Sequence, residues 1–290
     1  MILSKSLRRI LFSLSLVVTF LFIVWPILIM VLEAFDVDLS PLFSGEGITF
    51  IGGVPFYSGG FHPNLANLID ALNIYSFPSL VGNSVVIAAL NITLAVAAGV
   101  PAAYFMARSG LKGKEALGYL VLALRTVSPL AIVIPLYIVF VQNGLWDTYP
   151  GVALAYLAVD LPVVVLMLRS FFSDIPAEVY EAAEVSGASE TQIFRRVALP
   201  MVVAGVAATA IFAFVLVWNE FVLASILTGG ATKTVSVGIW TGAGENLGGF
   251  RTTDWGQTNI YGLLAFIPAY AVILGIRKYL SRGFTLAAAR

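Results

Sequence analysis

The stretch "EAAEVSGASETQIFRRVALP", residues 181 to 200, is polar and rich in small residues, and long apolar runs flank it on both sides. It contains three glutamates, two adjacent arginines and a terminal Leu-Pro. The whole chain is 59% hydrophobic and only 11% charged, whereas a soluble domain carries about 25% charged residues. This deficit indicates that lipid surrounds most of the chain, so the polar stretch interrupts a membrane protein.

Six segments are apolar enough to cross a bilayer core, which is about 30 Å thick and needs roughly 20 helical residues. They cover residues 10–32, 84–106, 117–141, 152–168, 201–227 and 257–276. The first is longer than the apolar region of a cleaved signal, and no A-x-A site follows it, so we expect a permanent anchor. The sequence therefore predicts one all-α integral membrane domain over residues 1–290, with six transmembrane helices.

The basic residues set the expected orientation, because Lys and Arg favour the cytoplasmic side of a membrane. They precede the first span, follow the last, and lie between spans two and three and between spans four and five. Residues 33–83 contain acidic residues but no Lys or Arg. We therefore expect a multi-pass protein of the cell membrane with both termini cytoplasmic, an extracytoplasmic loop at 33–83 and a cytoplasmic loop at 174–200. The outer loop either covers the bundle or serves as a platform for an extracytoplasmic partner.

The composition excludes several kinds of chemistry. The chain has no cysteine and a single histidine, His62, so we expect no disulfide, metal site or cofactor. A net charge of zero gives no basic field for a nucleic-acid partner. The chain also lacks a G-x-x-x-x-G-K-[ST] phosphate-binding loop. We therefore expect no catalytic residue here, and any ATP hydrolysis must belong to another protein.

Local rules predict a helix, a turn and a second helix within the 174–200 loop. Asp174, or the serine before it, can cap the first helix, and Pro176 suits its first turn. Gly187 is placed to end that helix. Ser189 and Gln192, three residues apart, match a capping box, so a second helix begins there and continues into span five.

The first of these helices has the composition of a docking element. Glu178, Glu181 and Glu184 recur every three residues and place acid on one side, while Ala182 and Ala183 allow another backbone to approach closely. An alternative is an amphipathic connector that lies on the bilayer. Such a helix usually has a strongly apolar face and basic flanks, and this one has little of either.

The same stretch resembles the EAA loop of binding-protein-dependent ABC importer permeases. The family pattern is E-A-A, three residues, G, nine residues and I-x-L-P. Here it reads Glu181-Ala182-Ala183, Gly187, Val197 and Leu199-Pro200, with valine replacing isoleucine. Further stretches are similar to the carbohydrate permeases of this family, including those of maltose systems: "NSVVIAAL" (83–90), "AAYFMARSGLKGKEAL" (102–117), "IPLYIVFVQNGLWDTYPGVALAY" (134–156), "FFSDIPAEVYEAA" (171–183) and "FAFVLVWNEFVLA" (212–224). The C-terminal "GFTLAAAR" departs from the glycine-rich tail frequent in that group.

The resemblance implies the ABC type I importer permease fold and a subunit of an ATP-driven importer for a sugar or oligosaccharide. Its expected partners are a second homologous permease subunit, an ABC ATPase dimer, an extracytoplasmic solute-binding protein and the lipid membrane. The ATPase-coupling residues carried over from the motif are Glu178, Glu181, Ala182, Ala183, Ser186, Gly187 and Ala188.

Charges inside the spans are functional candidates because they are costly in lipid. Arg125 and Asp160 lie at similar depths, so they either form a structural ion pair or contact solute. In "WNEF", Trp218 either stacks on a sugar ring or packs as an interfacial anchor. The candidate residues of the solute path are Asn83, Asp160, Trp218, Asn219 and Glu220.

Two other functions are compatible with this composition. An ion-coupled secondary transporter would use Arg125, Asp160 and Glu220 as a relay, and would transport without an ATPase. A membrane assembly protein would not transport solute at all. The ion-coupled transporter leaves the 174–200 loop without a role, and the assembly protein predicts no solute-stimulated ATP hydrolysis.

Overall fold

The computed structural model describes most of the chain and divides it into two compact units. The described residues are 5–35, 37, 48–51, 54–57, 65–73, 77–108, 128–242, 244–247, 250–253 and 255–288, with single positions at 116, 118 and 123. Unit 1 comprises residues 1–77 and 239–266, and unit 2 comprises residues 78–238 and 267–290.

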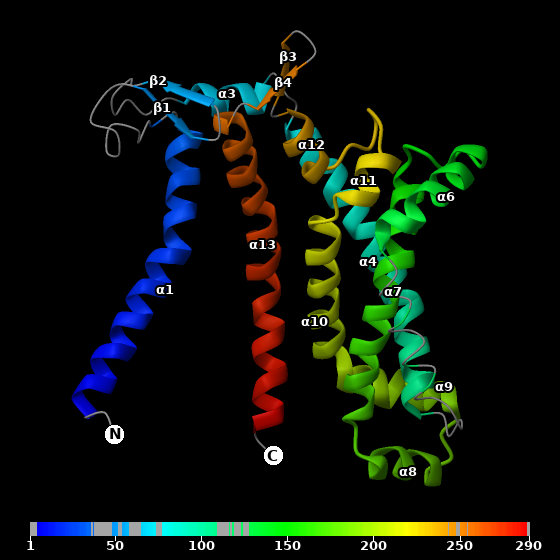
Figure 1. Cartoon of the computed structure of the whole chain (residues 1–290). Coiled ribbons are helices and arrows are strands. Elements are labelled where there is room, and N and C mark those ends of the chain that lie inside the picture. The colour runs from blue at the N-terminus through cyan, green and yellow to red at the C-terminus, as the bar shows by residue number, and fades with distance from the viewer. Residues whose placement is uncertain are drawn as a thin grey trace. The chain divides into compact units, whose positions relative to one another are not determined.

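Unit 1 combines long helices with two short antiparallel hairpins (Figure 1). Its elements are α1 (Lys5–Ala34), β1 (Ile48–Ile51), β2 (Val54–Tyr57), α3 (Ala66–Asn73), β3 (Gly244–Leu247), β4 (Phe250–Thr253) and the first part of α13 (Trp255–Ala288). β1 pairs with β2, and β3 with β4. The Asn259 side chain donates a 2.7 Å hydrogen bond to Glu33, and this bond joins α13 to the end of α1.

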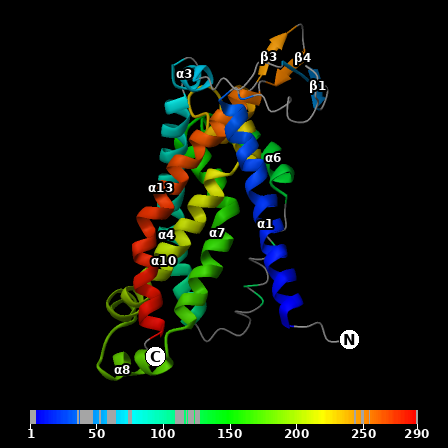
Figure 2. The ribbon, with the colours of Figure 1, turned by 90° about the vertical axis from the view of Figure 1, so that its left-hand side faces the viewer.

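Unit 2 contains the elements around the 174–200 loop. They are α4 (Phe77–Arg108), α6 (Pro129–Gln142), α7 (Tyr149–Ser173), α8 (Ala177–Val185), α9 (Glu190–Gln192), a π-helix (Ile193–Ala198), α10 (Leu199–Trp218), α11 (Val222–Leu227), α12 (Val235–Gly242) and the rest of α13. α4, α7 and α10 run side by side, with α8 near one end of them and α11 near the other (Figures 1 and 2).

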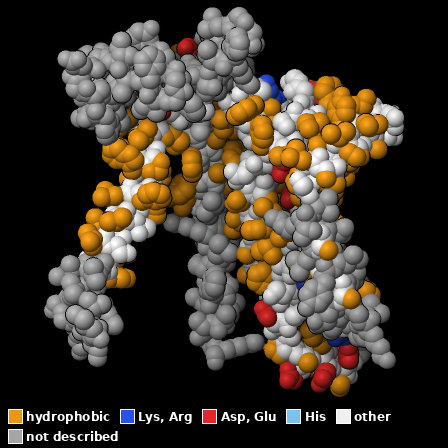
Figure 3. Space-filling view, viewed as in Figure 1, with side chains coloured by type: hydrophobic (Ala, Val, Ile, Leu, Met, Phe, Trp, Pro, Cys, Tyr) orange, Lys and Arg blue, Asp and Glu red, His pale blue; other side chains and the backbone are white. Residues whose placement is uncertain are grey.

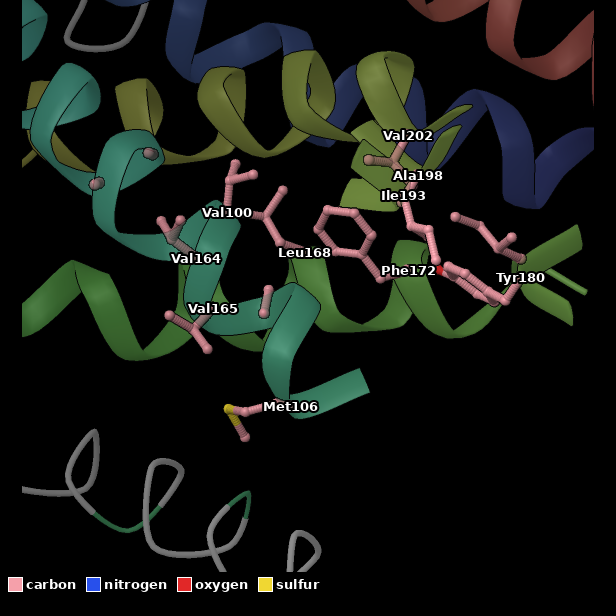
Figure 4. Packing of buried hydrophobic residues seen from close by; sticks show 14 residues of the cluster. Val100, Met106, Val164, Val165, Leu168, Phe172, Tyr180, Ile193, Ala198 and Val202 are labelled. Carbon is pink, nitrogen blue, oxygen red and sulfur yellow. The ribbon is translucent and has the colours of Figure 1, made fainter. Parts of the chain in front are cut away.

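The core of unit 2 lies between α4, α7 and the helices that follow α8 (Figure 4). Val100 of α4 and Leu168 and Phe172 of α7 are buried together with Ile193 and other apolar side chains. α10 approaches α7 at Gly205, where an added Cβ would lie 2.4 Å from the Phe171 ring. Small residues of this kind let membrane helices pack closely.

Four helices within the described residues are long and apolar enough to cross a membrane. They cover Phe12–Ala34, Phe77–Arg108, Tyr149–Ser173 and Glu190–Trp218. Large apolar side chains are exposed along the described helices (Figure 3), as expected of surfaces that face lipid. The candidate membrane spans are thus all helices, and the two hairpins depart from the all-α prediction. The expected spans 10–32, 84–106, 152–168 and 257–276 each fall inside one helix.

The remaining span predictions need correction or fall partly outside the described residues. The segment 201–227 is not one helix, because α10 ends at Trp218 and α11 begins at Val222. The loop expected at 33–83 is shorter than predicted, since α1 continues to Ala34 and α4 already begins at Phe77. Of the segment 117–141, α6 accounts for the part from residue 129 onward, and residues 117–128 lie mostly outside the described part of the chain.

Candidate functional site

α8 begins immediately after the chain changes direction at the end of α7. Asp174 is the C-cap of α7, so it does not cap α8. The N-cap of α8 is Pro176, in an extended conformation, and its carbonyl accepts the Val179 N–H at 3.2 Å. Pro176 therefore lies one position before the predicted first turn. The buried side chains of Ile175 and Tyr180 fix the start of α8 to the core.

Gly187 ends α8, as the sequence predicts. Its φ of +78° lies in the left-handed region, which glycine adopts without steric cost. The Gly187 N–H reaches the Glu184 carbonyl at 2.8 Å, and the Ala188 N–H reaches the Ala183 carbonyl at 3.1 Å. These two bonds form a Schellman motif, so the turn after α8 has a defined geometry.

The second helix begins with the predicted capping box. The Gln192 N–H donates to Ser189 Oγ at 3.4 Å, and the Ser189 N–H donates to Gln192 Oε1 at 2.9 Å. α9 is short, and the π-helix Ile193–Ala198 connects it to α10. π-helices are rare and often lie at functional sites.

The surface that α8 presents to solvent is acidic and made of small side chains. Of the seven predicted coupling residues, Glu178, Glu181, Ala182, Ser186 and Gly187 are exposed, and Ala183 and Ala188 are half-buried. Acidic side chains gather at this end of unit 2 (Figure 3). The loop also exposes 90% of the Val185 side chain. Sequence reasoning missed Val185. Its position beside the E-A-A motif was the one signal that could have pointed to it.

A groove of about 540 Å³ separates α8 from the end of α4. Its lining includes Arg108, Tyr180, Glu181 and Glu184. Burial raises the pKa of the Tyr180 hydroxyl; nearby Arg108 lowers it and Glu190 raises it further, and the net direction is upward. Tyr180 is therefore a neutral ring beside charged groups, and the groove combines acidic side chains with one cation.

Arg108 connects the two helices of the loop to α4. Its guanidinium forms an ion pair with Glu184 of α8, and its Nε lies 3.0 and 3.2 Å from the two Glu190 carboxylate oxygens of α9. Its Cζ lies 4.7 Å from the centre of the Tyr180 ring. The Tyr104 hydroxyl, one helical turn earlier, donates to Glu190 at 2.9 Å. Sequence reasoning used Arg108 only for orientation, because its partners are far away along the chain.

Comparison with known proteins decides the family. The family model "Binding-protein-dependent transport system inner membrane component" matches residues 99–286. The chain belongs to this family. The permease is 30% identical over 286 residues to a probable ABC transporter permease protein of Sinorhizobium fredii, an alignment that covers 98% of this chain and 96% of the relative.

Two further comparisons give a similar sequence and a similar fold. The permease is 34% identical over 172 residues to the trehalose transport system permease protein SugB of Mycobacterium tuberculosis, covering 58% of this chain and 63% of the relative. Its fold matches that of a bacterial ABC transporter involved in the import of the acidic polysaccharide alginate, with a TM-score of 0.72 and 18% identity over 96% of this chain and 99% of the other. The protein is therefore a multi-pass inner-membrane component with the ABC importer permease fold.

The permease uses its "WNEF" residues at the break between α10 and α11. Trp218 is buried and stacks on Phe214, with ring centroids 5.3 Å apart. The Asn219 side chain donates to the Val215 carbonyl at 2.8 Å. Glu220 Oε1 accepts the Leu223 N–H at 3.0 Å. Asn219 thus closes α10 and Glu220 opens α11, which explains why the apolar run is not one helix.

The other two candidates for the solute path lie in different surroundings. The Asn83 side chain donates to the carbonyls of Ala231 and Lys233, at 3.2 and 3.0 Å, and accepts from the Tyr149 hydroxyl at 2.7 Å. It joins α4 and α7 to the loop before α12. Asp160 is buried within α7, and its suggested partner Arg125 lies outside the described residues.

A second charged residue that sequence reasoning missed is Asp147, between α6 and α7. Its carboxylate accepts four hydrogen bonds of 2.7–3.1 Å from the backbone N–H groups of Gly229, Ala231 and Thr232 and from the Thr232 hydroxyl. Burial alone would raise the pKa of Asp147, but these donors outweigh it and lower the pKa below its usual value. Asp147 has a φ of +54°, which Asp tolerates better than most residues.

Proposed function

We propose that the permease forms a transport path for a sugar or oligosaccharide together with a second homologous permease subunit. An extracytoplasmic solute-binding protein supplies the solute, and an ABC ATPase dimer supplies the energy from the cytoplasm. The family supports the dependence on a binding protein. The trehalose relative and the carbohydrate-permease stretches support the solute class.

The exposed face of α8 is the proposed contact with the ATPase. The observation that carries this proposal is a short helix with defined ends at both sides, whose outward surface combines Glu178, Glu181, Ala182 and a 90% exposed Val185. Within the described residues, Glu178 and Glu181 take part in neither of the two ion pairs. A stiff element with free carboxylates fits a basic cleft, and rigid packed elements transmit domain movements.

Reversing one charge on α8 tests this contact. Glu181→Lys should leave the protein inserted in the membrane but separate transport from ATP hydrolysis, because like charges would then meet at the ATPase. Co-purification of the ATPase and the amount of solute imported per ATP are measured in proteoliposomes. Asp174→Lys is the matched control, since Asp174 is also exposed but lies before α8. Normal coupling in Glu181→Lys would falsify the docking assignment.

The energy source and the solute class are tested separately. Proteoliposomes that contain the complete complex should import radiolabelled disaccharides or oligosaccharides only when ATP and the loaded binding protein are both present. Import driven by an ion gradient without ATP would favour the ion-coupled transporter instead. Binding measurements with the partner binding protein identify which sugars to use.

Asp160 is the proposed membrane-embedded member of the solute path. Its carboxylate is buried in an apolar span, where ionisable residues usually serve a function. Asp160→Asn should lower solute import more than it lowers assembly of the complex. The proposal for Asp160 would be wrong if Asp160→Asn changed neither the import rate nor the apparent affinity for loaded binding protein.

A further inference from the structure

Within the described residues, α8 packs on the core of unit 2 through one small apolar face, in which Val179 and Ala183 are half-buried beside Tyr180. Tyr180 is its single buried side chain, and its other residues are exposed or half-buried. A helix that transmits a displacement must not pivot on its own turn. Because the apolar face of α8 is small, polar contacts beside it would help to fix the direction of α8 relative to the membrane helices.

The contacts of Arg108 meet this need. We name the set Arg108, Tyr104, Tyr180, Glu184 and Glu190 the Arg108 clamp. Glu184 precedes Gly187 and Glu190 follows it, so one guanidinium from α4 reaches both sides of the turn. The same group lies over the Tyr180 ring, four residues before Glu184 on the same face of α8.

The geometry requires arginine in particular. A guanidinium is planar and carries five donors in a fixed fork, so it can serve two carboxylates while stacking on an aromatic ring. A lysine ammonium is a point charge, so it would still attract the two carboxylates but would not hold them, or the ring, in a fixed geometry. The Arg108 side chain is 19% exposed, whereas those of Glu184 and Glu190 are 53% and 66% exposed. Exposed ion pairs contribute little stability, so the main effect of the clamp is to orient α8 relative to α4.

The far end of α4 is also fixed. Asn83 bonds to the carbonyls of residues 231 and 233, and the Ser84 hydroxyl accepts the Val235 N–H at 2.8 Å. From Asn83 to Arg108, α4 spans roughly 38 Å at about 1.5 Å per residue. α4 therefore joins the clamp to the loop before α12 as one continuous helix, the kind of element through which coupling between distant sites travels.

We propose that Arg108 is a positioning residue that locks α8 and α9 to the end of α4, so that movement of α8 is passed to the membrane helices. The inference rests on the proposed docking of the ATPase on α8. It assigns Arg108 no contact with ATP or solute. Its loss should free α8 to pivot while its docking surface stays intact.

The first experiment measures the pivot directly, without the ATPase. The natural chain has no cysteine, so Val185→Cys carries a single nitroxide label at the exposed tip of α8 in the full-length permease in lipid nanodiscs. Adding Arg108→Gln should increase label mobility, whereas adding Arg195→Gln, which removes an exposed arginine from the same loop, should not. Equal mobility in the parent and Arg108→Gln proteins would overturn the proposal whether or not α8 binds an ATPase.

The second experiment measures coupling in the complete complex. Arg108→Gln should retain the ATPase on co-purification but lower the solute imported per ATP by about fivefold or more, the usual scale of coupling between sites. The double variant Glu184→Gln with Glu190→Gln removes the same contacts from the other side and should give the same loss, which covers the case in which Arg108→Gln assembles poorly. An import ratio equal to that of Arg195→Gln would overturn the positioning role. Arg108→Gln could increase label mobility while Glu181→Lys imports a normal amount of solute per ATP. In that case the assignment of the docking surface is wrong, and that of the clamp stands.

Discussion

The two ends of unit 2 are each organised by one charged residue, but in opposite ways. At the α8 end, Arg108 uses a long side chain to reach two exposed carboxylates and a ring. At the α11 end, Asp147 uses a short side chain to collect three backbone N–H groups and one hydroxyl from the 229–232 loop. We call this second set the Asp147 knot.

The difference between side-chain contacts and backbone contacts indicates which end of unit 2 can change its contacts more easily. Contacts between flexible, solvent-exposed side chains can break and re-form, because water replaces each partner at little cost. Hydrogen bonds from backbone groups to a carboxylate fix the main chain itself, and their loss leaves donors without partners. The clamp therefore holds the direction of α8 through side chains alone, so that α8 and the end of α4 move together, whereas the knot fixes the main chain of a corner.

The largest expected effect is the loss of the Asp147 knot. Asp147→Ala removes the acceptor of four donors and should lower the free energy of unfolding by about 3 kcal/mol, since hydrogen bonds to charged groups contribute about 1.5–3 kcal/mol. Thermal unfolding of the detergent-solubilised protein measures this. Asp147→Asn is the matched control, because Asn tolerates the same positive φ and keeps one acceptor, so it should lose less. Equal stability of all three proteins would show that the knot does not hold this corner.

The pH dependence of the knot has a defined sign. The folded protein holds the Asp147 pKa below its usual value, so the stabilisation is present above the unfolded pKa of about 3.9. It is lost as the pH falls through the folded pKa. The stability difference between the natural protein and Asp147→Asn should be constant from neutral pH to about pH 5 and should narrow below about pH 4.

A matched pair of glycines gives a smaller effect that separates the two ends. Gly144 after α6 and Gly187 after α8 both have positive φ, at +67° and +78°, and neither would bring an added Cβ within 4 Å of another group. Both close a Schellman motif. Gly144→Ala and Gly187→Ala should each cost about 1 kcal/mol of stability because of the left-handed backbone.

Only Gly187→Ala should also lower the solute imported per ATP, because only that turn follows α8, the proposed docking helix. Unfolding midpoints and import ratios measured on both variants provide the comparison. A similar loss of import in Gly144→Ala would mean that coupling is sensitive to any turn of unit 2, and the distinction between the ends would be lost.

Salt should give the smallest effect and should act on one end alone. Raising the ionic strength from 0.1 M to 1 M shortens the Debye length from about 10 Å to about 3 Å, and exposed ion pairs contribute less than about 1 kcal/mol. A nitroxide at Val185→Cys should become more mobile in high salt. One at Gly230→Cys, in the loop held by Asp147 and with open space around its Cα, should not. An equal change in label mobility at the two positions would mean that both ends are held by contacts of the same kind.

Local rules predicted the parts of the loop that depend on neighbouring residues. Gly187 and the Ser189–Gln192 capping box lie where the sequence indicates, because their hydrogen bonds join residues three to five positions apart. The same rules predict Pro176 in the first turn of α8, whereas it is the N-cap, one position earlier. The reason is that Asp174, the predicted cap of α8, instead ends α7. Hydropathy placed the spans 10–32, 84–106, 152–168 and 257–276 inside single helices, but it did not predict the interruption at Asn219–Phe221, where polar side chains cap two helices inside one apolar run.

Contacts between distant parts of the chain were beyond sequence reasoning. Arg108 lies 76 residues from Glu184 and 82 from Glu190, and Asp147 lies 82 or more from its donors. Neither spacing has a local signature. The basic residues at the end of span two were visible in the sequence, but only the packing of α4, α7 and α10 reveals their partners.

The π-helix Ile193–Ala198 sets the rotational phase between the loop and the span that follows it. Each residue of an α-helix advances the chain by roughly 100° around its axis. A π-helix holds more residues per turn than an α-helix, so if these six residues formed an ordinary α-helix, α9, and α8 with it, would swing by about a quarter turn around α10. A substitution that turns this segment into an α-helix without changing its length would therefore point the proposed docking surface of α8 in another direction while leaving every membrane span intact.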